Sequence, residues 1–143
     1  NRAQVLQLLN EALATELVCI NRYKRHYYTV TGVANAGIKA EFLEHATQEQ
    51  QHADWLAQRI VQLNGMPDFN PATLLDRSHA EYDDSREVQA MVRANLLAER
   101  VAIESYRQMI ELIGDSDPTT KQLLTQIMAV EEEHADDMRD LLA

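Results

Sequence analysis

EQQHAD, from Glu49 to Asp54, is the stretch that decides the fold of this chain, because its pattern E-x-x-H-A-D returns at Glu131–Asp136. Each copy follows a segment of the form E-x-V-x-I-x-x-Y, which spans Glu16–Tyr23 in the first half and Glu99–Tyr106 in the second. The chain is therefore a doubled pair of segments. Each half contributes one isolated glutamate and one Glu-x-x-His.

Apolar residues around these motifs recur three and four positions apart, which is the period of an amphipathic helix. The pattern predicts four long helices, over about 2–31, 35–64, 84–113 and from Pro118 onward. Glycines mark the ends of the first three helices, and glycine is the usual residue just beyond a helix. These glycines are Gly32, Gly65 and Gly114.

Two helix starts carry capping residues. Asp84-x-x-Glu87 resembles a capping box, in which side chains satisfy the free backbone N–H groups of the first turn, so we expect the third helix to begin near Asp84. Asp117 offers an N-cap oxygen, and Pro118 has the backbone angle of a first helical residue. The fourth helix should begin there.

Residues 66–83 contain Pro67 and Pro71 and no sustained period, so we interpret them as a connection with one short helical turn near Leu74–Leu75. Extended, such a segment reaches about 60 Å, whereas a helix of this size is roughly 40 Å long. The connection can therefore run the length of a bundle. The predicted fold class is an all-α four-helix bundle, in which two antiparallel hairpins are joined by a long crossover.

Composition agrees with this fold and limits the function. The 143 residues include only 4 glycines and 3 prolines, and we expect one domain over residues 1–143. A net charge of −10 disfavours nucleic acid as a partner and attracts cations. No signal peptide or run of 18 apolar residues is evident, which predicts no membrane association. The single cysteine, Cys19, favours the cytoplasm.

Six polar side chains occupy places on the helical stripes where the pattern requires apolar residues. They are Glu16, Glu49, His52, Glu99, Glu131 and His134. Each unpaired buried carboxylate costs several kcal/mol, and a domain is stable by only about 5–15 kcal/mol in total. Two divalent cations would balance the four carboxylates, and the i, i+3 spacing lets each Glu-x-x-His reach one metal. A single Glu-x-x-His would be weak support, but two copies with matched companions predict a dinuclear metal site.

Residues near these six invite secondary predictions. Tyr23 and Tyr106 follow the isolated glutamates by two turns, so each is either a phenol bonded to a bridging carboxylate, or an electron donor, or a plain core aromatic. We expect Asp54 and Asp136 to bond the histidine of the neighbouring helix. His45 is an accessory cation ligand or, more simply, a surface histidine.

The donor set also limits the metal. Oxygen-rich sites with two imidazoles and no thiolate suit iron or manganese better than zinc or copper(I). Two such ions bridged by carboxylates can each give an electron to dioxygen or peroxide. We therefore expect two iron ions, with manganese as the alternative.

The motifs resemble those of the bacterioferritins, within the ferritin-like di-iron superfamily. The resemblance covers nearly the whole chain and is carried by three segments, at Glu16–His26, Glu49–Pro67 and Glu131–Met138. It implies a ferritin-like bundle whose six matching residues are ferroxidase ligands. In that scheme Glu16, Glu49 and His52 hold the first iron, Glu99 and His134 the second, and Glu49 and Glu131 bridge them. The implied catalytic set is these six residues and Tyr23.

Two features depart from the bacterioferritin pattern. That family binds haem through a methionine directly after the second-helix ligand, and here this position is Gln50, so we expect no haem. The sequence ends at Ala143 without the family's short fifth helix, which argues against a 24-subunit cage. Because the first residue is Asn1 rather than methionine, we expect a few native residues to precede it.

The sequence thus leads to one main hypothesis about function and two alternatives. The main one is a ferroxidase of bacterioferritin type, which oxidises Fe(II) with O2 or H2O2, forms at least a homodimer, and stores iron if it assembles into a cage. The first alternative is a non-storage di-iron or di-manganese peroxidase or oxidase, similar to rubrerythrin. The second is a Dps-like DNA-protecting shell, which the acidic charge and the presence of ligands in both halves disfavour.

Overall fold

The computed structural model describes residues 1–143 and contains helices and no strands. Four helices are long and one is a single turn. The long helices are α1 (Arg2–Thr29), α2 (Ala36–Gln62), α4 (Val88–Ile113) and α5 (Pro118–Leu142); the short one is α3 (Leu74–Arg77). Two 3-10 turns, Val33–Asn35 and Pro71–Thr73, precede α2 and α3. The predicted all-α bundle is confirmed.

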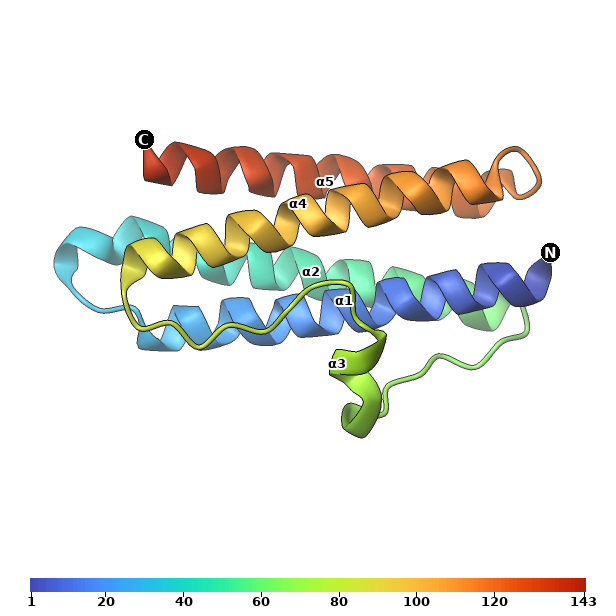
Figure 1. The fold of residues 1–143 in the computed structure, drawn as a ribbon, viewed down its shortest axis with the longest axis horizontal. Helices are drawn as coiled ribbons and strands as arrows, with labels where there is room; N and C mark the ends of the chain where they lie inside the picture. The colour runs from blue at the N-terminus through green and yellow to red at the C-terminus, as the bar shows by residue number, and fades with distance from the viewer.

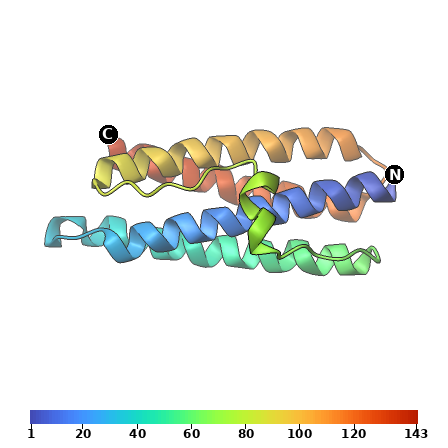
Figure 2. The same cartoon turned by 60° about the horizontal axis from the view of Figure 1, so that its bottom comes forward.

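The chain folds as two antiparallel hairpins, α1 with α2 and α4 with α5 (Figure 1). The crossover leaves the end of α2, passes through α3 beside α1, and returns along the bundle to the start of α4 (Figures 1 and 2). Helices α2 and α4 therefore run parallel, as the length of the crossover predicted. The crossover is fixed to α1 by the backbone N–H of His79, which donates to the Thr15 hydroxyl at 2.9 Å.

One helix start was predicted correctly and another was wrong. The Asp117 carboxylate accepts from the backbone N–H of Thr120 at 3.1 Å, and Pro118 opens α5. Helix α4 begins at Val88, however, and no side chain caps it at Glu87. Before α4 begins, the chain is stabilised at residues 83–85 by Asp83, whose carboxylate accepts hydrogen bonds from the backbone N–H and the hydroxyl of Ser85. The chain therefore stays non-helical through Asp84 and needs no capping box.

The apolar core has two main clusters, one toward each end of the bundle, and a third, small cluster of Cys19, Ala80 and Ala98. The larger contains Leu9, Leu56, Ile60, Tyr106, Leu124 and Ile127, and the smaller contains Tyr23, Phe42, Met91, Val92 and Met138. Burying a side chain of this size stabilises the fold by about 1.5–3 kcal/mol. The polar residues singled out by the sequence lie between the two clusters.

Helix α1 alone is long and apolar enough to pass a length and composition test for a membrane span. Over half of that segment is buried against the other helices. Core helices of soluble proteins pass the same test, so this finding is weak support for membrane insertion.

Gly114 ends α4 with φ 57° and ψ −135°, a backbone conformation that is nearly restricted to glycine. We expect Gly114→Ala to lower the free energy of unfolding by about 1–3 kcal/mol. Gly37→Ala is the matched control, because Gly37 is helical and an added Cβ meets nothing within 4 Å; it should stabilise by roughly 0.5–1 kcal/mol. Urea unfolding measures both. Equal effects of the two substitutions would contradict the assignment of strain to position 114.

Candidate dinuclear metal centre

All four long helices contribute to one buried polar layer. Glu16 comes from α1, Glu49 and His52 from α2, Glu99 from α4, and Glu131 and His134 from α5. None of the six is more than 1 % exposed. Each lies on the inward stripe of its helix, between the two apolar clusters, because Glu and His three residues apart share one helical face.

Their ligand atoms form two overlapping groups. Glu16, Glu49, His52 and Glu131 make one group, and Glu49, Glu99, Glu131 and His134 make the other. Within each group the donor atoms all lie within 4.8 Å of one another. Glu49 and Glu131 belong to both, so they are placed as bridges between two metal positions.

The layer contains polar atoms without hydrogen-bond partners, which is costly in a buried site. Both oxygens of Glu49, one oxygen each of Glu16, Glu99 and Glu131, and Nδ1 of His134 are in this state. His134 Nδ1 lies 2.9 Å from Glu49 Oε1, yet the pair does not have hydrogen-bond geometry. His52 and Glu131 are hydrogen-bonded at 3.0 Å, but these other donor atoms converge without bonding one another, which fits the coordination of a cation. The residues present therefore fit a pair of divalent ions.

Without a cation the carboxylates repel one another. Burial, and then the charges of neighbouring glutamates, raise the pKa of Glu49 and of Glu131 well above the ordinary value. Burial also opposes ionisation of Glu99, but the Glu131 and His134 side chains beside it outweigh that effect and lower its pKa to about 2. In the metal-free cluster the bridging carboxylates thus hold protons to higher pH than ordinary glutamates do, and bound cations would compete with these protons.

Each of the two tyrosines donates a hydrogen bond to a glutamate in the other half of the chain. Tyr23 of α1 donates to Glu99 of α4 at 2.8 Å, and Tyr106 of α4 donates to Glu16 of α1 at 2.5 Å. Burial raises the pKa of both phenols well above the ordinary value, so they remain donors. The expected bond to a bridging carboxylate was wrong in its partner, because Glu99 and Glu16 each belong to only one of the two donor groups.

The expectation for Asp54 and Asp136 was wrong. Asp54 accepts from Gln50, and Asp136 pairs with Arg139, both on the exposed surface. A residue two places after a histidine lies about 200° around the helix, so it faces away from the layer. The side chain that bonds His134 at Nε2 is Gln48 of α2 instead.

His45 was also misjudged as a surface histidine, since it is 1 % exposed. Its ring stacks on His134 with 3.9 Å between centroids, Nδ1 lies 3.1 Å from the Tyr23 hydroxyl, and Nε2 lies 3.2 Å from Asp137. Burial, and then the nearby His134, lower its pKa to about 4. The sequence gave one clue, because His45 stands one turn before Glu49.

Arg22 is a buried cation that the sequence reasoning missed. It is 0 % exposed, and its Nε donates to Asn95 at 2.6 Å. The Asn95 amide contacts His26 at 2.9 Å, and His26 contacts Asp83 at 2.9 Å. This chain of contacts links α1, α4 and the crossover. The sequence held one clue to the burial of Arg22. Its partner Asn95 is a polar residue next to Leu96, on an apolar stripe.

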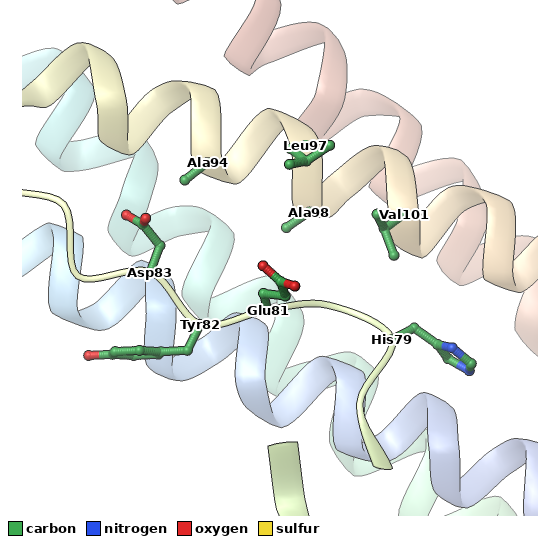
Figure 3. A pocket seen from close by; sticks show the side chains of 8 residues that line it. All are labelled: His79, Glu81, Tyr82, Asp83, Ala94, Leu97, Ala98 and Val101. Atoms are coloured by element: carbon green, nitrogen blue, oxygen red, sulfur yellow. The ribbon is translucent and has the colours of Figure 1, made fainter. Parts of the chain in front are cut away.

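A cavity of about 260 Å³ lies between the crossover and α4, away from this centre (Figure 3). Its α4 wall is apolar, with Ala94, Leu97, Ala98 and Val101, and its crossover wall carries His79, Glu81, Tyr82 and Asp83. None of the six candidate ligands lines it, so it is separate from the candidate metal centre.

Comparison with known proteins shows which family and which structures this chain is similar to. A model of the ferritin-like domain matches residues 6–143. Bacterioferritin of Brucella melitensis is 30% identical over 98% of this chain and 85% of its own, and the nutrient stress-induced DNA-binding protein of a Synechococcus strain is 27% identical over 99% and 82%. The solved structure of a dodecameric thioferritin, the bacterioferritin-related protein of Bacteroides fragilis, superposes with a TM-score of 0.94 at 30% identity, covering 99% of this chain and 86% of that one.

The chain belongs to the ferritin-like domain family, and bacterioferritins are among its relatives. Iron storage and ferroxidase activity are the functions that these relatives support at the level of the family. Gln50, at the position where the resemblance places a haem-binding methionine, is exposed. The absence of haem stays a prediction.

The raised pKa values of the bridging glutamates predict how pH acts on the metal-free protein. A carboxyl whose pKa is higher in the folded state contributes stability below about pH 4.5, which is lost as pH rises through the folded value. Glu49→Gln removes that loss, so its stability relative to wild type should increase as pH rises above about 4.5. Urea midpoints of the metal-free proteins measure the difference.

The matched control is Glu132→Gln, because Glu132 is exposed beside Glu131. Its difference from wild type should not depend on pH. Addition of Mn(II) should reverse the order of Glu49→Gln and wild type, since a ligand at 100 times its Kd stabilises by about 2.7 kcal/mol. If the difference in stability between Glu49→Gln and wild type did not depend on pH, the raised pKa of Glu49 would be contradicted.

Proposed function

We propose that this protein oxidises Fe(II) at a dinuclear site within each subunit, with O2 or H2O2 as the oxidant. The observation that carries this proposal is the overlap of two four-residue donor groups that share Glu49 and Glu131. A dinuclear site formed by one chain is the arrangement expected for a ferroxidase of bacterioferritin type. The relatives named above support the same function at the level of the family.

Charge and donor type both favour iron. Two divalent ions offset the four carboxylates, and the two neutral imidazoles complete the set. Paired iron ions supply one electron each to the oxidant. Manganese can occupy the same donors but is the second choice.

The chain's own residues would hold this site in place. Tyr23 and Tyr106 donate to Glu99 and Glu16 and fix the orientation of these two carboxylates. Gln48 contacts His134 at Nε2, which leaves Nδ1 directed at the bridging glutamates. The apolar clusters on either side exclude bulk water. Partners of this kind typically contribute 10–100-fold to affinity or activity.

We also propose that the protein forms a homo-oligomeric shell in the cytoplasm and stores the oxidised iron. The similar thioferritin of Bacteroides fragilis is dodecameric, which favours twelve subunits. One relative is described as a DNA-binding protein, but the charge of −10 and the ligands in both halves of this chain oppose a DNA-protecting role. A nucleic-acid partner is therefore not part of the proposal.

Removal of a bridging carboxylate tests the reaction. Glu131→Ala should slow aerobic Fe(II) oxidation by more than about 100-fold, because a ligand contributes at least as much as a neighbouring partner. Glu132→Ala, whose side chain is exposed, should oxidise iron at the wild-type rate. Absorbance of ferric iron after mixing measures the rate, and far-UV circular dichroism checks the fold. Unchanged kinetics in Glu131→Ala would refute the site.

Iron capacity distinguishes storage from other di-iron chemistry. After aerobic loading, a storing shell should retain far more than the two ions that one centre holds per chain. Light scattering with size-exclusion chromatography gives the assembly mass, and iron analysis of the same fraction gives the ratio. A small oligomer with two ions per chain would instead indicate a peroxidase or oxidase.

A further inference from the structure

A second group of metal-ligand side chains lies beside the dinuclear centre. Glu41 and His45 stand one turn apart on α2, and Asp137 faces them from α5. One donor atom from each lies within 4.8 Å of the other two. His45 is buried, whereas the Asp137 side chain is 44% exposed, so the group connects the interior with solvent.

The hydrogen bonds around His45 fix which atom it directs at this group. The Tyr23 hydroxyl has one proton and donates it to Glu99. The Tyr23 hydroxyl oxygen must then accept a hydrogen bond, and the Nδ1–H group of His45 donates it. In that tautomer Nε2 has a free lone pair, and it faces Asp137 Oδ2 at 3.2 Å. With the ring neutral, Nε2 and Oδ2 are both acceptors, so either a metal cation or a second proton on the ring must lie between them.

The surrounding charge is negative and has no basic partner. Glu44 and Asp140 lie close enough to Glu41 and Asp137 for their charges to affect Glu41. Burial, and then these neighbouring carboxylates, raise the pKa of Glu41. Within the group His45 contacts Asp137, and no lysine or arginine forms an ion pair with any of the three side chains. The group therefore attracts cations from solvent.

We propose that Glu41, His45 and Asp137 form a third, mononuclear site for a first-row divalent transition metal. An imidazole and two carboxylates suit Fe(II), Mn(II) or Zn(II), whereas Mg(II) and Ca(II) prefer oxygen donors alone. The site is adjacent to the Glu99–His134 half of the centre, because His45 stacks on His134 and shares Tyr23 with Glu99. It is independent of the proposed ferroxidase activity.

Zn(II) is a suitable probe, because it does not change oxidation state. Crystals of the full chain soaked in Zn(II), with Mg(II) in excess, should show three anomalous peaks per chain, two in the centre and one between Glu41, His45 and Asp137. Asp137→Asn should lose the third peak and keep the pair. Asp136→Asn is the matched control, since Asp136 is exposed on the same helix and pairs with Arg139, and it should keep all three.

Zinc analysis after desalting should show one ion fewer per chain in Asp137→Asn than in wild type or in Asp136→Asn. Absence of the third peak, with His45 bonded directly to Asp137 through a proton on Nε2, would overturn the inference. So would a third peak that survives Asp137→Asn or is displaced by Mg(II). Loss of the pair with the third peak retained would refute the dinuclear site and leave this inference standing.

Discussion

The structure depends on the electrostatics of one buried layer, in which four carboxylates and two imidazoles separate two apolar clusters. Like charges in a dry interior repel strongly, and each unpaired ion costs several kcal/mol against a total stability of about 5–15 kcal/mol. The metal-free layer limits this cost by retaining protons on Glu49 and Glu131, and by the tyrosine hydrogen bonds to Glu16 and Glu99. Cations remove the repulsion itself. The burial of such a layer therefore fits the metal binding proposed for this site.

The same layer joins the two hairpins. Side chains pack more extensively within each hairpin than between the two. Four polar contacts of the layer instead join one hairpin to the other. They are Tyr23 with Glu99, Tyr106 with Glu16, His52 with Glu131, and His134 with Glu49. Every one of these pairs links the first hairpin to the second. Metal binding would strengthen the interface between the hairpins, which is less extensive than the packing within each hairpin. This explains why each half of the duplicated chain contributes half of the candidate ligands.

The sequence was sufficient for the four long helices and for the inward placement of the six residues, since both follow from periodicity along a single helix. It was also sufficient for the crossover, which follows from the length of the aperiodic segment 66–83. It failed for contacts between helices. Asp54 and Asp136 were assigned to histidines that they face away from, and His45 was placed on the surface although α5 and Tyr23 cover it. Local spacing tells which face a residue occupies on its own helix. Which side chain opposes it depends on the rotation and offset of the neighbouring helix, and a single sequence does not contain them.

The duplication is symmetric in its ligands and asymmetric around them. His45 stands four residues before Glu49, and the residue at the same place before Glu131 is Ile127; Arg22 precedes Tyr23, whereas Ser105 precedes Tyr106. Buried polar groups therefore gather on the Glu99–His134 side, and the matching Ile127 lies in the larger apolar cluster. The two candidate metal positions, whose donor sets are equivalent, thus have unequal surroundings: one is enclosed by hydrocarbon and the other is next to a polar, partly solvated group. Metals at the two positions should differ in affinity and in access to solvent, because the environment around a ligand set tunes both.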